Sequence, residues 1–228
     1  MTPRDQSSAD LDAHRVLDRD TFYIPNFITE QEEEYLLRKI AESPQPKWKK
    51  LANRRSTGAF KNSPHGQPNH IIMNEYLPGQ GIMPHEDGAS YFPVVATLSL
   101  QSHTVFHYYK YREEEDGSTT CTARSIDKSP VLSLLLEPRS LVISSGEMYT
   151  AHLHGRVILW PTPIDAIEED VVVTDVSNNP SAVSVSNFDR LDNQSLKTAI
   201  ESREPLRRSV RYSLTCRDIA RVSNFQRR

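Results

Sequence analysis

The stretch from Asn74 to Gly88 reads NEYLPGQGIMPHEDG and decides how the rest of the chain is interpreted. It predicts a strand that ends at Tyr76, a Pro- and Gly-containing turn over residues 77–81, and a second extended piece that carries His85 and Asp87. Side chains alternate between the two faces of a strand. Asn74 and Tyr76 therefore lie on the same face of their strand, and His85 and Asp87 lie on the same face of theirs.

An imidazole and a carboxylate two residues apart on an extended segment can form two corners of a metal site. A distant histidine would complete the two-His-one-carboxylate triad of non-haem Fe(II) oxygenases, which leaves coordination positions open. His152 and His154 follow later in the chain, two residues apart, and either could close the triad. An isolated His-x-Asp more often occurs by chance at the end of a strand. The rest of the chain must therefore decide between a metal site and a chance motif.

The composition is that of a soluble protein with one domain. The chain has 228 residues, of which 37% are hydrophobic and 25% charged. Its net charge of −3 gives the chain as a whole no electrostatic attraction for nucleic acid. Cys121 and Cys216 are too few for a disulfide scaffold or a usual structural zinc site. Without an apolar leader or a membrane-length apolar run, we expect a protein of the cytoplasm and nucleus with no membrane partner. We also expect a monomer.

The secondary-structure pattern is mostly β. A capping box at Thr29 and Glu32 predicts a helix over 30–41, after a short strand that stops at Pro25. The β-rich runs lie at 94–100, 104–109, 131–136, 140–143 and 156–160. Short strands with regular turn signals predict a sandwich or barrel, with helix only near the start and a meander joining 94–100 to 104–109.

Three segments lack a clear pattern. Residues 1–20 are polar and without periodicity, so we predict a flexible N-terminal arm before a domain over 21–222. Residues 161–205 are rich in acidic, Ser and Asn residues, so we predict a long, flexible insertion. Residues 223–228 form a short tail.

A basic stretch over residues 47–61 is the feature that points to nucleic acid. It mixes cationic and aromatic residues, and region 44–73 contains no Asp or Glu. The members are Lys47, Trp48, Lys49, Lys50, Arg54, Arg55, Phe60 and Lys61. Such a mixture can grip a phosphate backbone and stack a base. A solvated loop with Trp48 packed on the core explains the same residues.

The run RSVRYSLTCRDIAR over residues 208–221 places two arginines on one strand face. Arg211, Ser213, Thr215 and Arg217 lie two apart in sequence and share that face. Buried arginine normally needs an anionic partner, and its planar fork suits a carboxylate. The pattern therefore suggests a pocket for a small dicarboxylate, whereas an edge strand would leave both arginines in solvent.

Taken together, the motifs resemble those of AlkB-type Fe(II)/2-oxoglutarate-dependent dioxygenases, in particular the sixth eukaryotic branch of that family. The matching elements are Asn-x-Tyr at 74–76, His-x-Asp at 85–87, a later histidine, and Arg-x-Ser-x-Thr-x-Arg at 211–217. The resemblance runs from about residue 22 to 222, outside the insertion. It implies a mainly β double-stranded β-helix, the cupin-like jelly-roll, with an N-terminal helix.

The resemblance also implies roles for individual residues. His85, Asp87 and His154 would bind Fe(II), with His154 favoured over His152. Arg211 would pair with the distal carboxylate of 2-oxoglutarate, and Arg217 would lie near its keto-acid end and Asp87. The remaining cosubstrate residues would be Asn74, Tyr76 and Ser213, the last standing where the family more often has Asn.

The implied activity is hydroxylation or oxidative demethylation by molecular oxygen, with alkylated nucleic acid as a possible substrate. The chain departs from the family pattern in the region 44–73, which would form the lid over the substrate. Similar sequences have a longer segment here, whereas this chain has only residues 51–69. That departure supports an alternative, a non-catalytic or weakly active module that binds metal and 2-oxoglutarate. A zinc-binding cupin is disfavoured, because the arginine strand would then have no ligand.

Overall fold

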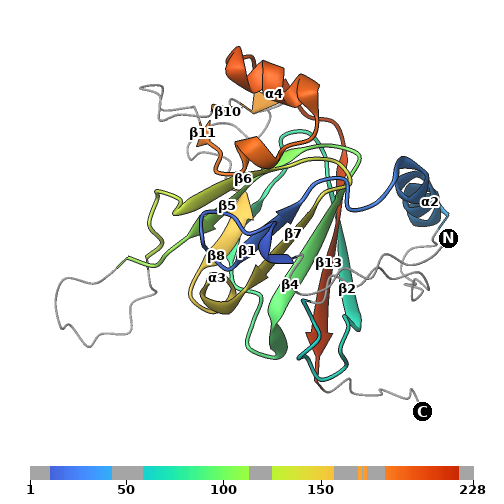
Figure 1. Ribbon diagram of the computed structural model, residues 1–228, viewed down its shortest axis with the longest axis vertical. Helices are drawn as coiled ribbons and strands as arrows, with labels where there is room; N and C mark the ends of the chain where they lie inside the picture. The colour runs from blue at the N-terminus through green and yellow to red at the C-terminus, as the bar shows by residue number, and fades with distance from the viewer. Residues whose placement is uncertain are drawn as a thin grey trace.

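Two antiparallel sheets form the body of the protein (Figure 1). The computed structural model describes residues 11–42, 59–112, 125–156, 169–170, 172–173 and 183–220. The larger sheet has five strands in the order β1-β7-β4-β13-β2, and the smaller has four in the order β3-β8-β5-β6. The long β13 runs between β4 and β2, as Figure 1 shows in red.

The strands of the larger sheet are β1 (Thr21–Ile24), β7 (Leu141–Ser145), β4 (Tyr91–Leu100), β13 (Arg211–Ile219) and β2 (His70–Tyr76). Those of the smaller sheet are β3 (Ile82–His85), β8 (Leu153–Arg156), β5 (Thr104–Tyr109) and β6 (Leu132–Leu136). The short strands β9 (Glu169–Asp170), β10 (Val172–Val173), β11 (Val183–Ser184) and β12 (Leu206–Arg207) form two small two-stranded sheets. The helices are α2 (Glu30–Ala41), α3 (Gly146–Thr150), α4 (Gln194–Glu201) and the 3-10 turn η2 (Phe188–Arg190).

The two sheets pack face to face, which confirms the predicted mainly β jelly-roll with a helix near its start. Tyr108 on β5 and Ser144 on β7 share a hydrogen bond of 2.7 Å across the interior. The outer face of the larger sheet buries Leu98 and Leu214 against Leu36 and Leu37 of α2. The helix begins as predicted, because Thr29 and Glu32 form both hydrogen bonds of the capping box.

The predicted meander between residues 94–100 and 104–109 is wrong. These runs are strands as expected, but β4 belongs to the larger sheet and β5 to the smaller one. Gln101 has a φ of +71°, in the left-handed region, where the chain turns away from β4. The connection over residues 101–103 therefore passes from one sheet to the other, as a jelly-roll requires.

The described part of the predicted N-terminal arm, residues 11–20, packs on the domain. Val16 is 1% exposed, and its N–H donates to the carbonyl of Thr21 at 2.9 Å. The N–H of Tyr23 donates to the carbonyl of His14 at 2.9 Å. These bonds satisfy the outer edge of β1, so the segment protects a sheet edge that composition alone does not reveal.

The described end of the predicted insertion, residues 183–205, is likewise ordered and contributes to the core. The side chain of Asn187 accepts from the N–H of Leu135 and donates to its carbonyl, both at 2.9 Å. Leu191 and Ile200 are 3% and 1% exposed. The segment covers the free edge of β6, and it adds a helix, α4, to a half of the chain where we predicted none. The tail 223–228 and most of 161–182 lie outside the described residues.

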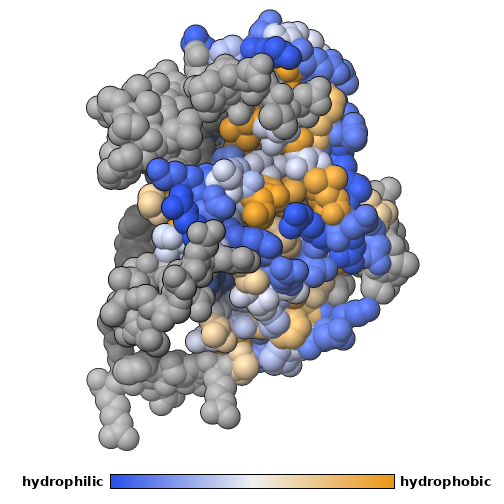
Figure 2. Space-filling view, turned by 90° about the vertical axis from the view of Figure 1, so that its left-hand side faces the viewer, coloured by the Kyte–Doolittle hydropathy of each residue, from blue (hydrophilic) through white to orange (hydrophobic). Residues whose placement is uncertain are grey.

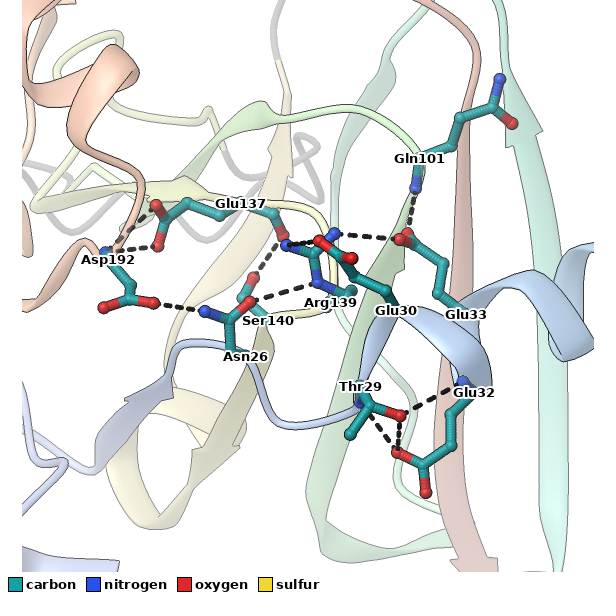
Figure 3. Close-up of polar contacts among 10 residues, drawn as sticks. All are labelled: Asn26, Thr29, Glu30, Glu32, Glu33, Gln101, Glu137, Arg139, Ser140 and Asp192. Carbon is teal, nitrogen blue, oxygen red and sulfur yellow. Dashed lines mark hydrogen bonds and ion pairs between the residues drawn. The ribbon is translucent and has the colours of Figure 1, made fainter.

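A polar network connects the turn between β6 and β7 to α2 and to the segment that precedes α4 (Figure 3). Glu137, which is 3% exposed, accepts hydrogen bonds from the Tyr23 hydroxyl at 2.6 Å and from the backbone N–H of Asn193 at 2.7 Å. On the other side of the turn, Arg139 pairs with Glu33 of α2 at 3.2 Å. The turn thus connects β1, α2 and the segment that leads into α4.

The surface is mixed in character. On the face shown in Figure 2, hydrophobic residues form several small patches that hydrophilic side chains interrupt. Single exposed apolar residues are ordinary on proteins. Among the described helices, none has the length and apolar character needed to cross a membrane.

Replacing Glu137 with Gln tests whether its buried carboxylate holds the α4 segment to the core. We expect a loss of about 2 to 3 kcal/mol in the free energy of unfolding, because an amide cannot accept at both oxygen positions and buried donors lose partners. Chemical denaturation measures the loss. Glu204→Gln is the control, since Glu204 is exposed in the same segment. Equal stability of the two variants would contradict this role.

Candidate active site

Three candidate ligands from two separate parts of the chain converge in the structure. His85 ends β3, Asp87 follows it, and His154 lies on β8. His85 and His154 are directly opposite partners in the β3–β8 pair. One ligand atom from each of the three residues lies within 4.8 Å of the others.

Gly155 allows β8 to approach β3 closely. A Cβ atom at this position would lie 2.8 Å from the carbonyl oxygen of Ile82 and 2.9 Å from the Cα of Pro84, both closer than real contacts allow. Only glycine therefore fits here without moving the backbone. The close approach sets the spacing between His85 and His154, which flank this contact.

A backbone hydrogen bond orients the ring of His85, and burial favours the neutral ring of His154. Nδ1 of His85 lies 2.8 Å from the carbonyl oxygen of Met83, so Nδ1 donates to that carbonyl and Nε2 is the nitrogen left for the cluster. Burial, with the charges of His85 and Arg217, lowers the pKa of His154 to about 3. A neutral imidazole is the form that binds metal.

Asp87 is the buried anionic member of the cluster, and one of its oxygens is free of protein donors. Oδ1 accepts a hydrogen bond from Arg217, whereas Oδ2 is buried with no hydrogen-bond partner. Oδ2 lies 3.6 Å from Nε2 of His154. Burial raises the pKa of the Asp87 carboxyl, although Arg217 and His85 act to lower it. A cation beside Oδ2 would stabilise the carboxylate.

The donor set fits a divalent transition metal. Ligand atoms about 2.1 Å from a shared ion lie roughly 3 to 3.5 Å from one another, so the observed separations need only a small contraction. Two imidazoles and one carboxylate match the facial triad that suits Fe(II) and leaves other positions open. The orphaned Oδ2 of Asp87 is the observation that most directly calls for a cation.

The structure distinguishes the two histidines that spacing could not separate. His152 is 1% exposed and lies outside the cluster, with its Nδ1 3.0 Å from the carbonyl of Glu147. It precedes β8 (Leu153–Arg156), so strand alternation does not extend to it. His154 is the histidine that meets His85 and Asp87.

Beside the cluster, a pocket is lined by residues of both sheets. Strand pairing places Arg211 opposite Tyr76 and Ser213 opposite Asn74, on β13 and β2. Opposite residues in an antiparallel pair project from the same face. All four line the pocket, so the sequence motifs at 74–76 and 211–217 form one wall.

The arginines at 211 and 217 are both buried, as the pattern predicted. Arg211 is 5% exposed, donates to Oγ of Ser99 at 2.8 Å, and lies over the ring of Tyr76. Arg217 is 8% exposed, binds Asp87, and lies over the ring of Tyr91. One arginine therefore reaches the triad, and the other lies along the same strand beside Tyr76.

Sequence reasoning missed several lining residues. They are Gln80, Gly81, Ile82, Thr97, Thr104, Val105, Phe106 and Arg208. Arg208 stands three residues before Arg211, so simple alternation places it on the opposite face. It enters the pocket because the chain over 208–210 lies outside both flanking strands. The one sequence signal for a role of Arg208 in the pocket is that a third arginine stands close to the motif at 211–217.

Most of the basic stretch 47–61 lies outside the described residues, including Trp48. Phe60 is 5% exposed and packs in the core under the larger sheet, so it is not available for base stacking. Lys61 is exposed. The described end of the stretch thus supplies one exposed cation and one core residue.

Comparison with known proteins identifies the family, although no family model matches the chain. The chain is 33% identical to the zebrafish (Danio rerio) protein named "Probable RNA/DNA demethylase ALKBH6", over 88% of this chain and 86% of that protein. The chain belongs to the AlkB family. A second relative of this AlkB-family chain is the Xenopus tropicalis tRNA (carboxymethyluridine(34)-5-O)-methyltransferase alkbh8, 31% identical over 52% of this chain and 16% of its own length.

Among solved structures, that of OsALKBH1 covers 90% of this chain and 100% of its own, with 12% identity and a TM-score of 0.45. That likeness is too low to carry an argument about either fold or function. The resemblance predicted from the motifs is confirmed by the ALKBH6 relative instead.

Replacing Asp87 with Ala tests the cluster as a metal site. We expect affinity for Mn(II), measured by calorimetric titration, to fall more than about 100-fold. Mutation of residues that only support the metal ligands already lowers metal affinity by about 10- to 100-fold, and Asp87 would be a ligand itself. Glu86→Ala is the control, since Glu86 is the exposed neighbour. Tight binding by the Asp87 variant would contradict the site.

Proposed function

We propose that this AlkB-family protein is an Fe(II)- and 2-oxoglutarate-dependent dioxygenase. The observation that carries the proposal is the convergence of His85, Asp87 and His154 beside a pocket that contains both predicted arginines, Arg211 and Arg217. A metal site alone fits many activities. A metal site next to buried guanidinium groups fits an enzyme activity whose cosubstrate is a small carboxylate.

His85, Asp87 and His154 would hold the iron. When bound, Fe(II) and 2-oxoglutarate supply oxidation of a substrate C–H bond by molecular oxygen, with 2-oxoglutarate converted to succinate and carbon dioxide. The carbonyl of Met83 fixes the ring of His85 with Nε2 directed to the cluster. Arg217 holds Oδ1 of Asp87, which leaves Oδ2 for the cation.

The cosubstrate would lie along the wall formed by β13 and β2. Arg211 would bind its distal carboxylate, and Asn74 and Tyr76 would donate hydrogen bonds from the opposite strand. Ser213 lies between the arginines and has a shorter reach than the asparagine common in the family. Thr97 and Thr215, 3.5 Å apart, supply further hydroxyls on the same wall.

Burial contributes to the chemistry by keeping water from the site. The ring of Phe106 stacks on that of His154, with centroids 5.5 Å apart. Asp87 and Arg217 are 7% and 8% exposed. Electrostatic contacts are stronger in a pocket of this kind than in water, so the ligands and the cosubstrate are held in a fixed arrangement.

Alkylated nucleic acid is the substrate class that we propose, with oxidative removal of a methyl group as the reaction. The printed name of the ALKBH6 relative, a probable RNA/DNA demethylase, supports this class. The basic stretch 47–61 offers cations for a phosphate backbone. We propose that the protein works as a monomer in the cytoplasm and nucleus.

Anaerobic titration with Fe(II) and 2-oxoglutarate tests the cofactor proposal. We expect the weak visible charge-transfer band of the chelate in the unsubstituted protein, and no band in Asp87→Ala. Arg211→Gln should bind 2-oxoglutarate about 10- to 100-fold more weakly, because charged hydrogen bonds contribute about 1.5 to 3 kcal/mol. Arg207→Gln, at an exposed position, is the control.

A missing band in the unsubstituted protein would overturn the proposal. A band without any release of succinate in air would instead favour the non-catalytic binding module as the function of the chain. Succinate release therefore separates the enzyme from the binder, because the binder holds both groups but does not turn them over.

The substrate proposal is tested by succinate release in the presence of oligonucleotides. N-methylated single-stranded RNA or DNA should increase the rate and release formaldehyde, whereas the unmethylated oligonucleotide of the same sequence should not. Replacing Lys47, Lys49 and Lys50 together with Gln should raise KM for the methylated oligonucleotide. Unchanged KM would exclude these lysines from substrate binding.

A further inference from the structure

Arg208 is the pocket residue that the family motifs leave without a role. Its side chain is 6% exposed and lines the same pocket as Arg211, which is 5% exposed. Among the described lining residues, three are arginines and none is acidic. Arg217 is paired with Asp87. Like charges repel and buried charges lose hydration, so Arg208 and Arg211 in one pocket favour an anionic ligand between them.

The position of Arg208 follows from strand register. Arg211 lies opposite Tyr76, which is the last residue of β2. Residues that precede Arg211 therefore run beside the turn that follows Tyr76. Arg208 lies at this turn, with both terminal nitrogens 3.4 Å from the carbonyl oxygen of Gln80.

The segment around Arg208 is held on two sides, so the guanidinium occupies a defined place. The N–H of the next residue, Ser209, donates to Oγ of Ser102 at 3.1 Å, which ties the segment to the connection between β4 and β5. The Gln80 side chain accepts from the N–H of Leu77 at 2.9 Å and closes the turn. A guanidinium fixed in this way is pre-organised to bind a carboxylate.

We propose that Arg208 is a second anchor for the distal carboxylate of the cosubstrate and sets the preference of the pocket for dicarboxylate over monocarboxylate 2-oxo acids. This inference rests on the proposed function. Arg211 approaches the carboxylate from the strand, and Arg208 approaches it from the turn. The carbonyl of Gln80 is a neutral acceptor, so a carboxylate there would gain charge-assisted hydrogen bonds.

The test compares two ligands that differ only in the distal carboxylate. Binding of 2-oxoglutarate and of 2-oxopentanoate to the Fe(II)-loaded protein is followed anaerobically through the charge-transfer band. We expect Arg208→Gln to weaken 2-oxoglutarate binding about 10- to 100-fold and to leave 2-oxopentanoate binding within about twofold. Arg207→Gln, the adjacent exposed arginine, should change neither.

Arg208→Lys, which keeps the charge but loses the planar fork, should fall between the unsubstituted protein and Arg208→Gln. Equal weakening of both ligands would assign Arg208 a purely structural role and overturn the inference. Unchanged binding of both would also overturn it, and the cofactor proposal would stand. No band in the unsubstituted protein would remove both.

Discussion

The hydrogen bonding of β13 to neighbours on both of its sides is the constraint on which the rest of the structure depends. On one side it pairs with β2 from Arg211 to Arg217, and on the other with β4. This register places the arginine motif against Asn74 and Tyr76. It also brings Arg217 to Asp87, a residue that belongs to neither strand. A slip of one residue would turn both arginines to the outer face of the sheet.

The smaller sheet contributes the opposite half of the site by a different device. There the spacing depends on Gly155, because β8 and β3 come close only where a side chain is absent. His85 and His154 flank this approach and meet as cross-strand partners. The two halves of the site therefore have separate origins, strand register in one sheet and a close backbone contact in the other.

Much of this architecture could be predicted from the sequence, because it rests on local signals. Alternation along residues 211–217 gave the inward face correctly, and the capping box at Thr29 gave the start of α2. The predictions failed where a contact was long-range. Val16 and Asn187 carry no local pattern, yet each lies in a segment that covers the edge of a strand distant in sequence. The polar composition of these two segments gave no sign that they pack on the sheets, because the hydrogen bonds that hold them come from backbone groups and from the side-chain amide of Asn187. Arg208 was missed for a similar reason, since alternation does not extend beyond a strand.

The place of β13 in the chain has a consequence for how the protein is made. It is the last strand that the structure describes, and its two neighbours precede it by more than a hundred residues. Until β13 has been synthesised, β2 and β4 therefore each expose an unpaired edge, and Asp87 lacks its hydrogen bond from Arg217. Long-range pairing of this kind is slow and leaves strand edges open to other chains. The nascent protein would be most vulnerable to aggregation just before β13 emerges, and the arginine side of the pocket would be assembled only then.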